Sequence, residues 1–219
     1  MGKYEVTQAE YEKYCSYTGT DSPRESYGDG DNYPAYFVSW YDAIVYCNKR
    51  SIAEGLTPCY SILNSTVPDE WGPVPTSETA TWDAVECNWN ANGYRLPTEA
   101  EWEWLARGGE NYTYPGSDNV DDVAWYWSNG TREVKTKAPN GYGLYDMSGN
   151  VFELCWDWYG SISDSTAADG PTSGSGRVFR SGSWYNVDAY CEVDFHSYNY
   201  TDPSERNYGF GFRVVRQAN

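Results

Sequence analysis

The stretch YRLPTEAEWE, residues 94–103, contains the clearest local structure signal in the chain. Thr98 and Glu101 have the spacing of a capping box, in which each side chain accepts a hydrogen bond from the other residue's backbone N–H. Trp102, Leu105 and Ala106 then follow at helical spacing, and two glycines at 108–109 stop the pattern. These signals predict a helix that begins after Thr98, ends before Gly108 and buries one face.

Working outward from this helix, two similar starts occur nearer the N-terminus. Residues 7–10 (TQAE) form another capping box, and Ser39 is followed by Asp42 at the third helical position. Beyond residue 110 glycine, asparagine, serine and proline are frequent, and alternating patches at 177–183 and 210–216 read as short strands. Helices early and strands late predict an α+β fold, loop-rich with few helices and short antiparallel strands, in a single domain over residues 1–219.

The composition limits both the partners and the core. The net charge is −17, which argues against nucleic acid and anionic membrane surfaces as partners. Only 31 of the 219 residues are Leu, Ile, Val or Phe, but 11 Trp and 22 Tyr provide large areas to bury. We therefore expect an aromatic core. No apolar run approaches the roughly 20 residues of a membrane span, so we expect no membrane insertion by this domain.

Several motifs resemble the formylglycine-generating-enzyme (sulfatase-modifying factor) superfamily, a variant of the C-type lectin fold. Besides residues 94–103, they are GKYEVT (2–7), VSWYDA (38–43), NGYGLYDMSGNV (140–151) and GFRVVR (211–216). They follow the family's order over nearly the whole chain. The resemblance implies the C-type lectin fold of the formylglycine-generating type, but the function must be argued from the site because a fold hosts many functions.

The resemblance also implies where a copper site would lie. Formylglycine-forming members bind copper through two cysteines, five residues apart, after a Gly-Ser-aromatic stretch. Here that stretch is Gly182-Ser183-Trp184, which places Asn186 at the first cysteine position and Cys191 at the second. An amide is no soft thiolate ligand, so we expect no copper and no enzyme activity. Iron-dependent relatives need three histidines, and the chain has one.

A calcium site of the family matches this chain better. By the resemblance, the ligands are the Asp146 side chain, the Gly149 and Val151 carbonyls and the Glu153 side chain. Closely spaced oxygen donors suit a hard cation. The alternative is that Asp146 and Glu153 only cap turns. We expect calcium here in a structural role.

The segment YNVDAYCEVDFHSYNYTDPSERNYGF, residues 185–210, has an unusual composition. It lacks Lys, Gln, Met and Trp, which an AAY codon cannot reach when only its adenines change. Glu192 and Glu205 alone fall outside the reachable set, and both are interpreted as fixed positions. The pattern resembles adenine-directed diversification by a retroelement, as in variable proteins built on this fold; an ordinary Tyr/Asn-rich loop face is the alternative. Tyr, Ser, Asn and Asp also dominate antibody binding surfaces.

These observations predict a variable ligand-binding segment at about 185–210. The candidate contact residues are Tyr185, Asn186, Val187, Asp188, Tyr190, Asp194, His196, Tyr198, Asn199, Tyr200, Asn207, Tyr208 and Phe210. We expect them to share one exposed face, anchored from beneath by Cys191, Val193 and a strand at 212–214.

The main hypothesis is a non-catalytic, monomeric surface receptor or adhesin-like protein that binds an unidentified protein or surface glycan. We expect it at the cell surface, lipid-anchored through an N-terminal segment outside this sequence. The alternatives are a copper oxidase of the formylglycine type and a calcium-stabilised sugar-binding lectin; neither the Glu-Pro-Asn nor the Trp-Asn-Asp tripeptide of animal lectins occurs.

Overall fold

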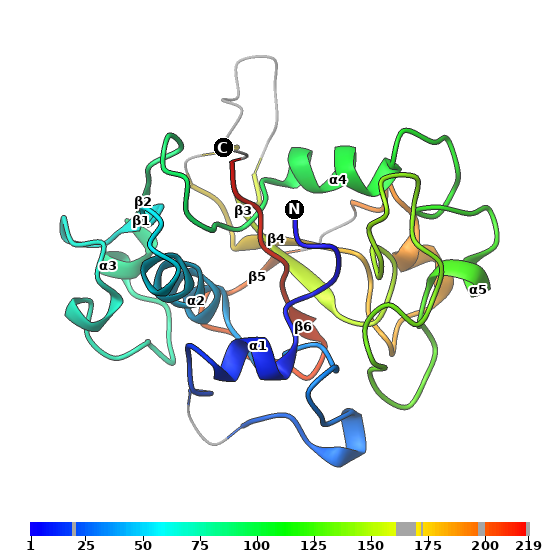
Figure 1. Cartoon of the computed structure of the whole chain (residues 1–219), viewed down its shortest axis with the longest axis horizontal. Coiled ribbons are helices and arrows are strands. Elements are labelled where there is room, and N and C mark those ends of the chain that lie inside the picture. The colour runs from blue at the N-terminus through cyan, green and yellow to red at the C-terminus, as the bar shows by residue number, and fades with distance from the viewer. Residues whose placement is uncertain (19–20, 161–169, 172, 197–199, 218–219) are drawn as a thin grey trace.

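A computed structural model describes residues 1–18, 21–160, 170–171, 173–196 and 200–217, and it has the expected α+β architecture with few helices and much irregular chain (Figure 1). The α-helices are α1 (Gln8–Glu12), α2 (Trp40–Ala53), α3 (Ala80–Asp83), α4 (Glu99–Arg107) and α5 (Val120–Val123). Short 3-10 helices are η1 (Glu25–Tyr27), η2 (Pro68–Glu70) and η3 (Asp188–Cys191). The strands are β1 (Tyr60–Ser61), β2 (Glu86–Cys87), β3 (Phe152–Trp158), β4 (Arg177–Arg180), β5 (Tyr200–Thr201) and β6 (Phe210–Gly211).

All three predicted helix starts are confirmed. Thr7, Ser39 and Thr98 each accept a hydrogen bond from the third helical N–H, and each capping box is complete. Helix α4 ends where predicted, because Gly108 takes up a left-handed conformation with φ of 60° that a side chain would disfavour. The short helices α3 and α5 were not predicted.

Four strands form the main sheet in the order β5-β4-β3-β6. Strand β3 pairs antiparallel with β4, placing Glu153 opposite Arg180, and pairs parallel with β6, placing Phe152 opposite Phe210. The predicted strand at 210–216 is therefore wrong beyond Gly211, although Val215 still forms an isolated antiparallel bridge with Arg95. The predicted strand at 177–183 ends at Arg180, because Ser181 adopts a positive φ of 88°.

The core is aromatic, as the composition predicts. Helix α2 supplies Trp40, Tyr41 and Tyr46, all fully buried, and these rings pack against others from distant segments. The Trp40 indole N–H also donates to the Cys155 carbonyl of β3, which ties the helix to the sheet. The ends of the described chain run side by side, since the Gly2 N–H donates to the Val214 carbonyl over 2.7 Å (Figure 1).

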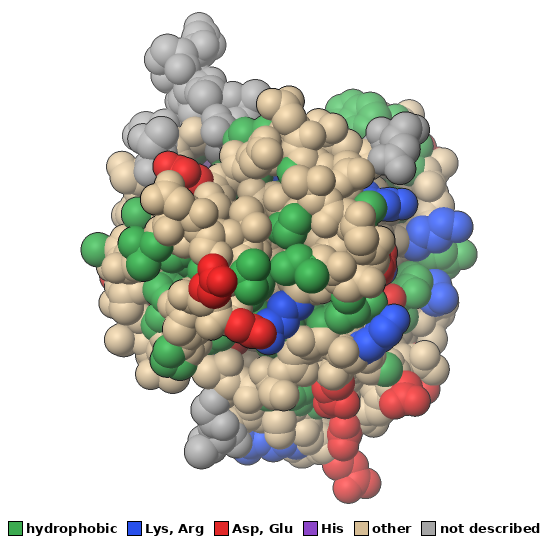
Figure 2. Space-filling view, turned by 60° about the vertical axis from the view of Figure 1, so that its left-hand side comes forward, with side chains coloured by type: hydrophobic (Ala, Val, Ile, Leu, Met, Phe, Trp, Pro, Cys, Tyr) green, Lys and Arg blue, Asp and Glu red, His purple; other side chains and the backbone are tan. Residues whose placement is uncertain are grey.

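Figure 2 turns the side that carries α2 and α3 toward the viewer, and hydrophobic side chains there are interspersed with polar ones. Among the helices of the described chain, none has both the length and the apolar character that crossing a bilayer requires.

Candidate ligand-binding segment

The segment after β4 is held by a turn centred on Asn186. Its side-chain oxygen accepts hydrogen bonds from both the backbone N–H and the hydroxyl of Ser183, at 3.1 and 2.6 Å. The buried Trp184 donates its backbone N–H to the Asn150 carbonyl, which fixes the turn to the loop before β3. Asn186 therefore uses its carbonyl oxygen for local structure and leaves its NH₂ group for outside contacts.

Two buried residues anchor the next stretch from beneath, as predicted. The Cys191 carbonyl accepts from the Ser148 hydroxyl, and the Val193 N–H donates to the Thr113 carbonyl. Both side chains are almost fully buried. The residues between and around them can therefore point outward without loosening the chain.

The exposure of the predicted contact residues varies along the segment. Val187, Asp188, Tyr190, Asp194, His196 and Tyr200 are exposed, whereas Tyr185, Asn186, Asn207 and Tyr208 are half-buried. Tyr198 and Asn199 lie outside the described residues. The prediction for Phe210 is wrong, because its ring is buried against Phe152 and Phe179, 5.7 and 5.1 Å away between ring centres.

Ring contacts arrange part of the segment into an aromatic cluster of Tyr27, Trp184, Tyr185 and Tyr208. Tyr27 stacks on Trp184 and on Tyr208, with ring centres 5.6 and 5.1 Å apart. Tyr185 meets Tyr208 edge to face at 5.3 Å. Trp184 is buried and the other three rings are half-buried, so the cluster exposes part of its surface.

Trp127 lies beside this cluster and was missed by the sequence reasoning. Its backbone N–H donates to the Asn186 carbonyl over 2.9 Å, and its side chain is 73% exposed. Its φ is 45°, a conformation that bulky residues rarely adopt. The aromatic run at 125–127, in otherwise polar loop sequence, was the available signal for it.

A second group of the predicted residues surrounds Tyr159. The ring of Tyr200 stacks on Tyr159 at 4.8 Å, and the imidazole of His196 lies 6.0 Å from the same ring. These contacts place His196 and Tyr200 together near the start of α4. Tyr190 belongs to neither group, because its ring packs against Phe195 with ring centres 4.5 Å apart. That the predicted residues share one exposed face stays a prediction.

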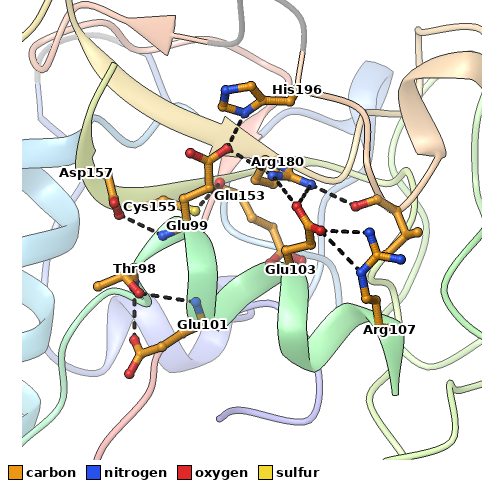
Figure 3. Close-up of polar contacts among 11 residues, drawn as sticks. Thr98, Glu99, Glu101, Glu103, Arg107, Glu153, Cys155, Asp157, Arg180 and His196 are labelled. Carbon is orange, nitrogen blue, oxygen red and sulfur yellow. Dashed lines mark hydrogen bonds and ion pairs between the residues drawn. The ribbon is translucent and has the colours of Figure 1, made fainter. Parts of the chain in front are cut away.

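His196 is tied to the scaffold by a network of charged groups (Figure 3). Its Nδ1 lies 2.6 Å from Oε1 of Glu99, and the same oxygen accepts from Arg180 over 2.9 Å. The Arg180 guanidinium is fully buried and also donates to the Val193 carbonyl. Beneath it, the Asp157 carboxylate accepts from the Glu99 N–H, and burial raises the pKa of Asp157 to about 7. His196 is therefore the predicted contact residue most firmly positioned by the fold.

The aligned copper positions do not fit copper. Asn186 stands at one position with its carbonyl oxygen bonded to Ser183. Cys191 stands at the other, where burial raises the pKa of its thiol to about 12. Asn186 supplies no thiolate, so one of the two cysteines that the formylglycine reaction uses is missing.

The predicted calcium ligands fit an ion only in part. Glu153 is fully buried and already has a cationic partner, because Nε of Arg213 donates to its Oε2 over 2.6 Å. The same oxygen accepts from the Trp102 indole N–H, while Asp146 accepts from the Lys135 N–H. Asp146 and the carbonyls of Gly149 and Val151 therefore remain as possible calcium ligands, whereas Glu153 forms an ion pair with Arg213. Calcium at this loop stays a prediction.

Comparisons with known proteins agree on the family. Residues 1–218 match the model of the sulfatase-modifying factor enzyme 1-like domain. Treponema denticola variable protein 1 is similar in structure, with 39% identity, a TM-score of 0.84 and coverage of 96% of this chain and 81% of that one.

Two further proteins are similar in sequence over nearly the whole of this chain. Chaperone protein LppX of Paenibacillus barcinonensis is 37% identical over 243 residues, covering 99% of this chain and 79% of the relative. The formylglycine-generating enzyme of Mus musculus is 31% identical over 249 residues, covering 96% of this chain but only 64% of the enzyme. The chain therefore belongs to the sulfatase-modifying factor enzyme 1-like family, as its motifs indicate.

Proposed function

We propose that this protein is a non-catalytic, monomeric ligand-binding protein whose segment 185–210 is diversified by a retroelement and contacts the ligand. One observation carries the proposal: a segment that, apart from Glu192 and Glu205, contains only AAY-reachable residues also contains a run of exposed side chains. Val187, Asp188 and Tyr190 project from a stretch that Cys191 and Val193 hold from below. The similarity to Treponema denticola variable protein 1 supports the same proposal.

The binding surface in this proposal has a fixed part and a variable part. Tyr27 and Trp127 lie outside residues 185–210, yet they adjoin the segment through ring stacking and a backbone hydrogen bond. Tryptophan and tyrosine often dominate binding energy because they bury a large area with little rotamer loss. The exposed edges of these rings therefore provide general affinity, and the variable residues provide specificity.

The ligand of this variant is a protein or a surface glycan in the proposal, and the protein acts at the cell surface, held by a lipid anchor. A diversified surface is useful where it meets varied partners, which favours this location. The formylglycine reaction is disfavoured by Asn186 and by the buried thiol of Cys191.

The genomic DNA around the gene tests the proposal. We expect a reverse-transcriptase gene and a repeat nearly identical to the codons for 185–210, mismatched only where the repeat has adenine. The codons for 149–158, which encode the start of the buried sheet, are the internal control and should have no repeat. A neighbourhood without a repeat, or with mismatches spread over all four bases, would refute the diversification.

A further inference from the structure

A pocket of about 330 Å³ lies between the α3–β2 region and the end of β3. Its walls include Trp89, Trp156 and Trp158, together with Asp83, Glu86 and Arg177. Figure 2 views the molecule from the side that carries α3 and β2. None of the described lining residues belongs to 185–210, although Arg177 on β4 pairs with Thr201 of that segment on β5.

Two of the indoles lie on β3, and the third, Trp89, follows β2. Trp156 and Trp158 are two residues apart on β3, so both project from the same face of the strand. Trp89 meets Trp156 at an interplanar angle of 89°, with ring centres 5.8 Å apart, which makes a corner. All three side chains are half-buried and keep part of their ring surface accessible.

Arg177 contributes a buried donor without a partner. Its guanidinium lies over the rings of Trp40 and Trp158, 3.7 and 3.8 Å from their centres, and Nη1 donates to the Trp156 carbonyl. Its Nε, however, is buried with no hydrogen-bond partner among the described residues. A buried N–H left unpaired costs about 1–3 kcal/mol. Because Nε has almost no accessible surface, a ligand oxygen in the pocket reaches it only after a small shift of the rings that cover it.

The charges around the pocket favour a neutral ligand. The pocket is lined by one guanidinium, from Arg177, and two carboxylates, from Asp83 and Glu86, so the excess negative charge disfavours an anion and a neutral ligand avoids that repulsion. Asp83 is oriented by the Tyr41 hydroxyl, which donates to its Oδ1. Carboxylates accept from hydroxyl groups, Arg177 donates to an oxygen, and indole faces cover aliphatic C–H surface.

We propose that this pocket binds one neutral pyranose ring of a carbohydrate, independently of calcium and of residues 185–210. The ring's C–H face packs on the indoles, a ring or hydroxyl oxygen accepts from Arg177, and hydroxyl groups donate to Asp83 and Glu86. The site therefore goes beyond the proposed function, because it supplies a second binding surface that the variable segment does not alter.

The test is titration of the whole chain in EDTA with methyl glycosides of glucose, galactose, mannose and N-acetylglucosamine, followed by calorimetry and by NMR saturation transfer. We expect at least one to bind, and Trp89→Ala to weaken it about tenfold, which is 1.4 kcal/mol. Trp158→Ala should act similarly, but it also uncovers Arg177, so Trp89→Ala is the primary variant. Trp104→Ala, an exposed indole on α4 outside both this pocket and the proposed binding segment, is the matched control and should bind normally.

Three outcomes would overturn the inference: no glycoside binds, Trp89→Ala and Trp104→Ala bind equally well, or methyl glucuronide binds more tightly than its neutral counterpart. A failure here leaves the genomic test of the 185–210 segment unaffected, so the two proposals stand or fall separately.

Discussion

Replacing Glu153 with Gln should destabilise the protein whether or not calcium is present. Glu153 and Arg213 are both fully buried, and Arg213 also donates to the carbonyls of Gly2, Tyr145 and Asp146. This one guanidinium therefore joins the N-terminal segment, the loop before β3 and the chain after β6. Its neutralising partner is Glu153, at 2.6 Å.

The magnitude follows from the burial of the pair. Removing one member of a buried ion pair costs about 3–5 kcal/mol, because the other charge stays uncompensated. Gln keeps the shape and one oxygen for the Trp102 indole, and the carboxylates of Glu5 and Asp146 still act on Arg213. We therefore expect a loss of about 2–4 kcal/mol in the free energy of unfolding, a large share of the usual 5–15 kcal/mol.

Urea unfolding followed by tryptophan fluorescence measures this loss. With a slope of about 2 kcal/mol per molar, the midpoint should fall by about 1–2 M, equally in EDTA and in calcium. Glu12→Gln, at an exposed position at the end of α1, is the matched control and should leave the midpoint unchanged. If Glu153→Gln lowers the midpoint only in calcium, Glu153 is a calcium ligand and the ion-pair reasoning is wrong.

Three further predictions follow from other parts of the structure. Burial raises the pKa of Asp157 from its ordinary 3.8 to about 7, so this carboxyl should lower the free energy of unfolding as pH rises from about 4 to 7. The loss should be about 2–4 kcal/mol. Asp157→Asn should remove this pH dependence, which urea unfolding at several pH values measures. A variant with serine at 187, 188 and 190 should lose about 1.5 kcal/mol of unfolding free energy at most, whereas Trp102→Ala should lose about 3–5 kcal/mol. Parallel thermal melts compare the two variants. Equal losses would mean that residues 187–190 belong to the core. Anaerobic titration with cuprous ion should show no stoichiometric binding; one tight equivalent would revive the oxidase alternative.

Helix starts and ends, which depend on residues close together in the sequence, were predicted best. Each capping box at Thr7, Ser39 and Thr98 involves residues three apart, so the signal and the structure lie in the same few residues. The stop of α4 at Gly108 is equally local. Trp102 was also assigned to the inner face of its helix correctly, because helical periodicity places it there.

Features that depend on distant partners were predicted poorly. Strand β6 has two residues because it pairs with its parallel partner, β3, only at Phe152 and Glu153. The sequence near Gly211 does not predict that the strand ends there. Glu153 resembles a calcium ligand in its local motif, but its cationic partner lies 60 residues away at Arg213. Likewise, Trp127 joins the candidate segment only through a turn at Asn186.

The error at Phe210 leads to a sharper prediction about the genomic repeat. Codon reachability describes what an adenine-directed process can produce, but it contains no information on burial. Phe210 and Cys191 are both reachable and both buried, and replacing a buried aromatic residue costs about 3–5 kcal/mol. A process that varied these positions would unfold most of its products, whereas Asp188 and Tyr190 are exposed and tolerate change. The repeat should therefore have AAY at the codons for Asp188 and Tyr190, and should already encode Phe and Cys at 210 and 191. Alignment of repeat and gene checks this directly. AAY at 191 or 210 would mean that burial does not limit diversification, and the link between exposure and variability would be lost.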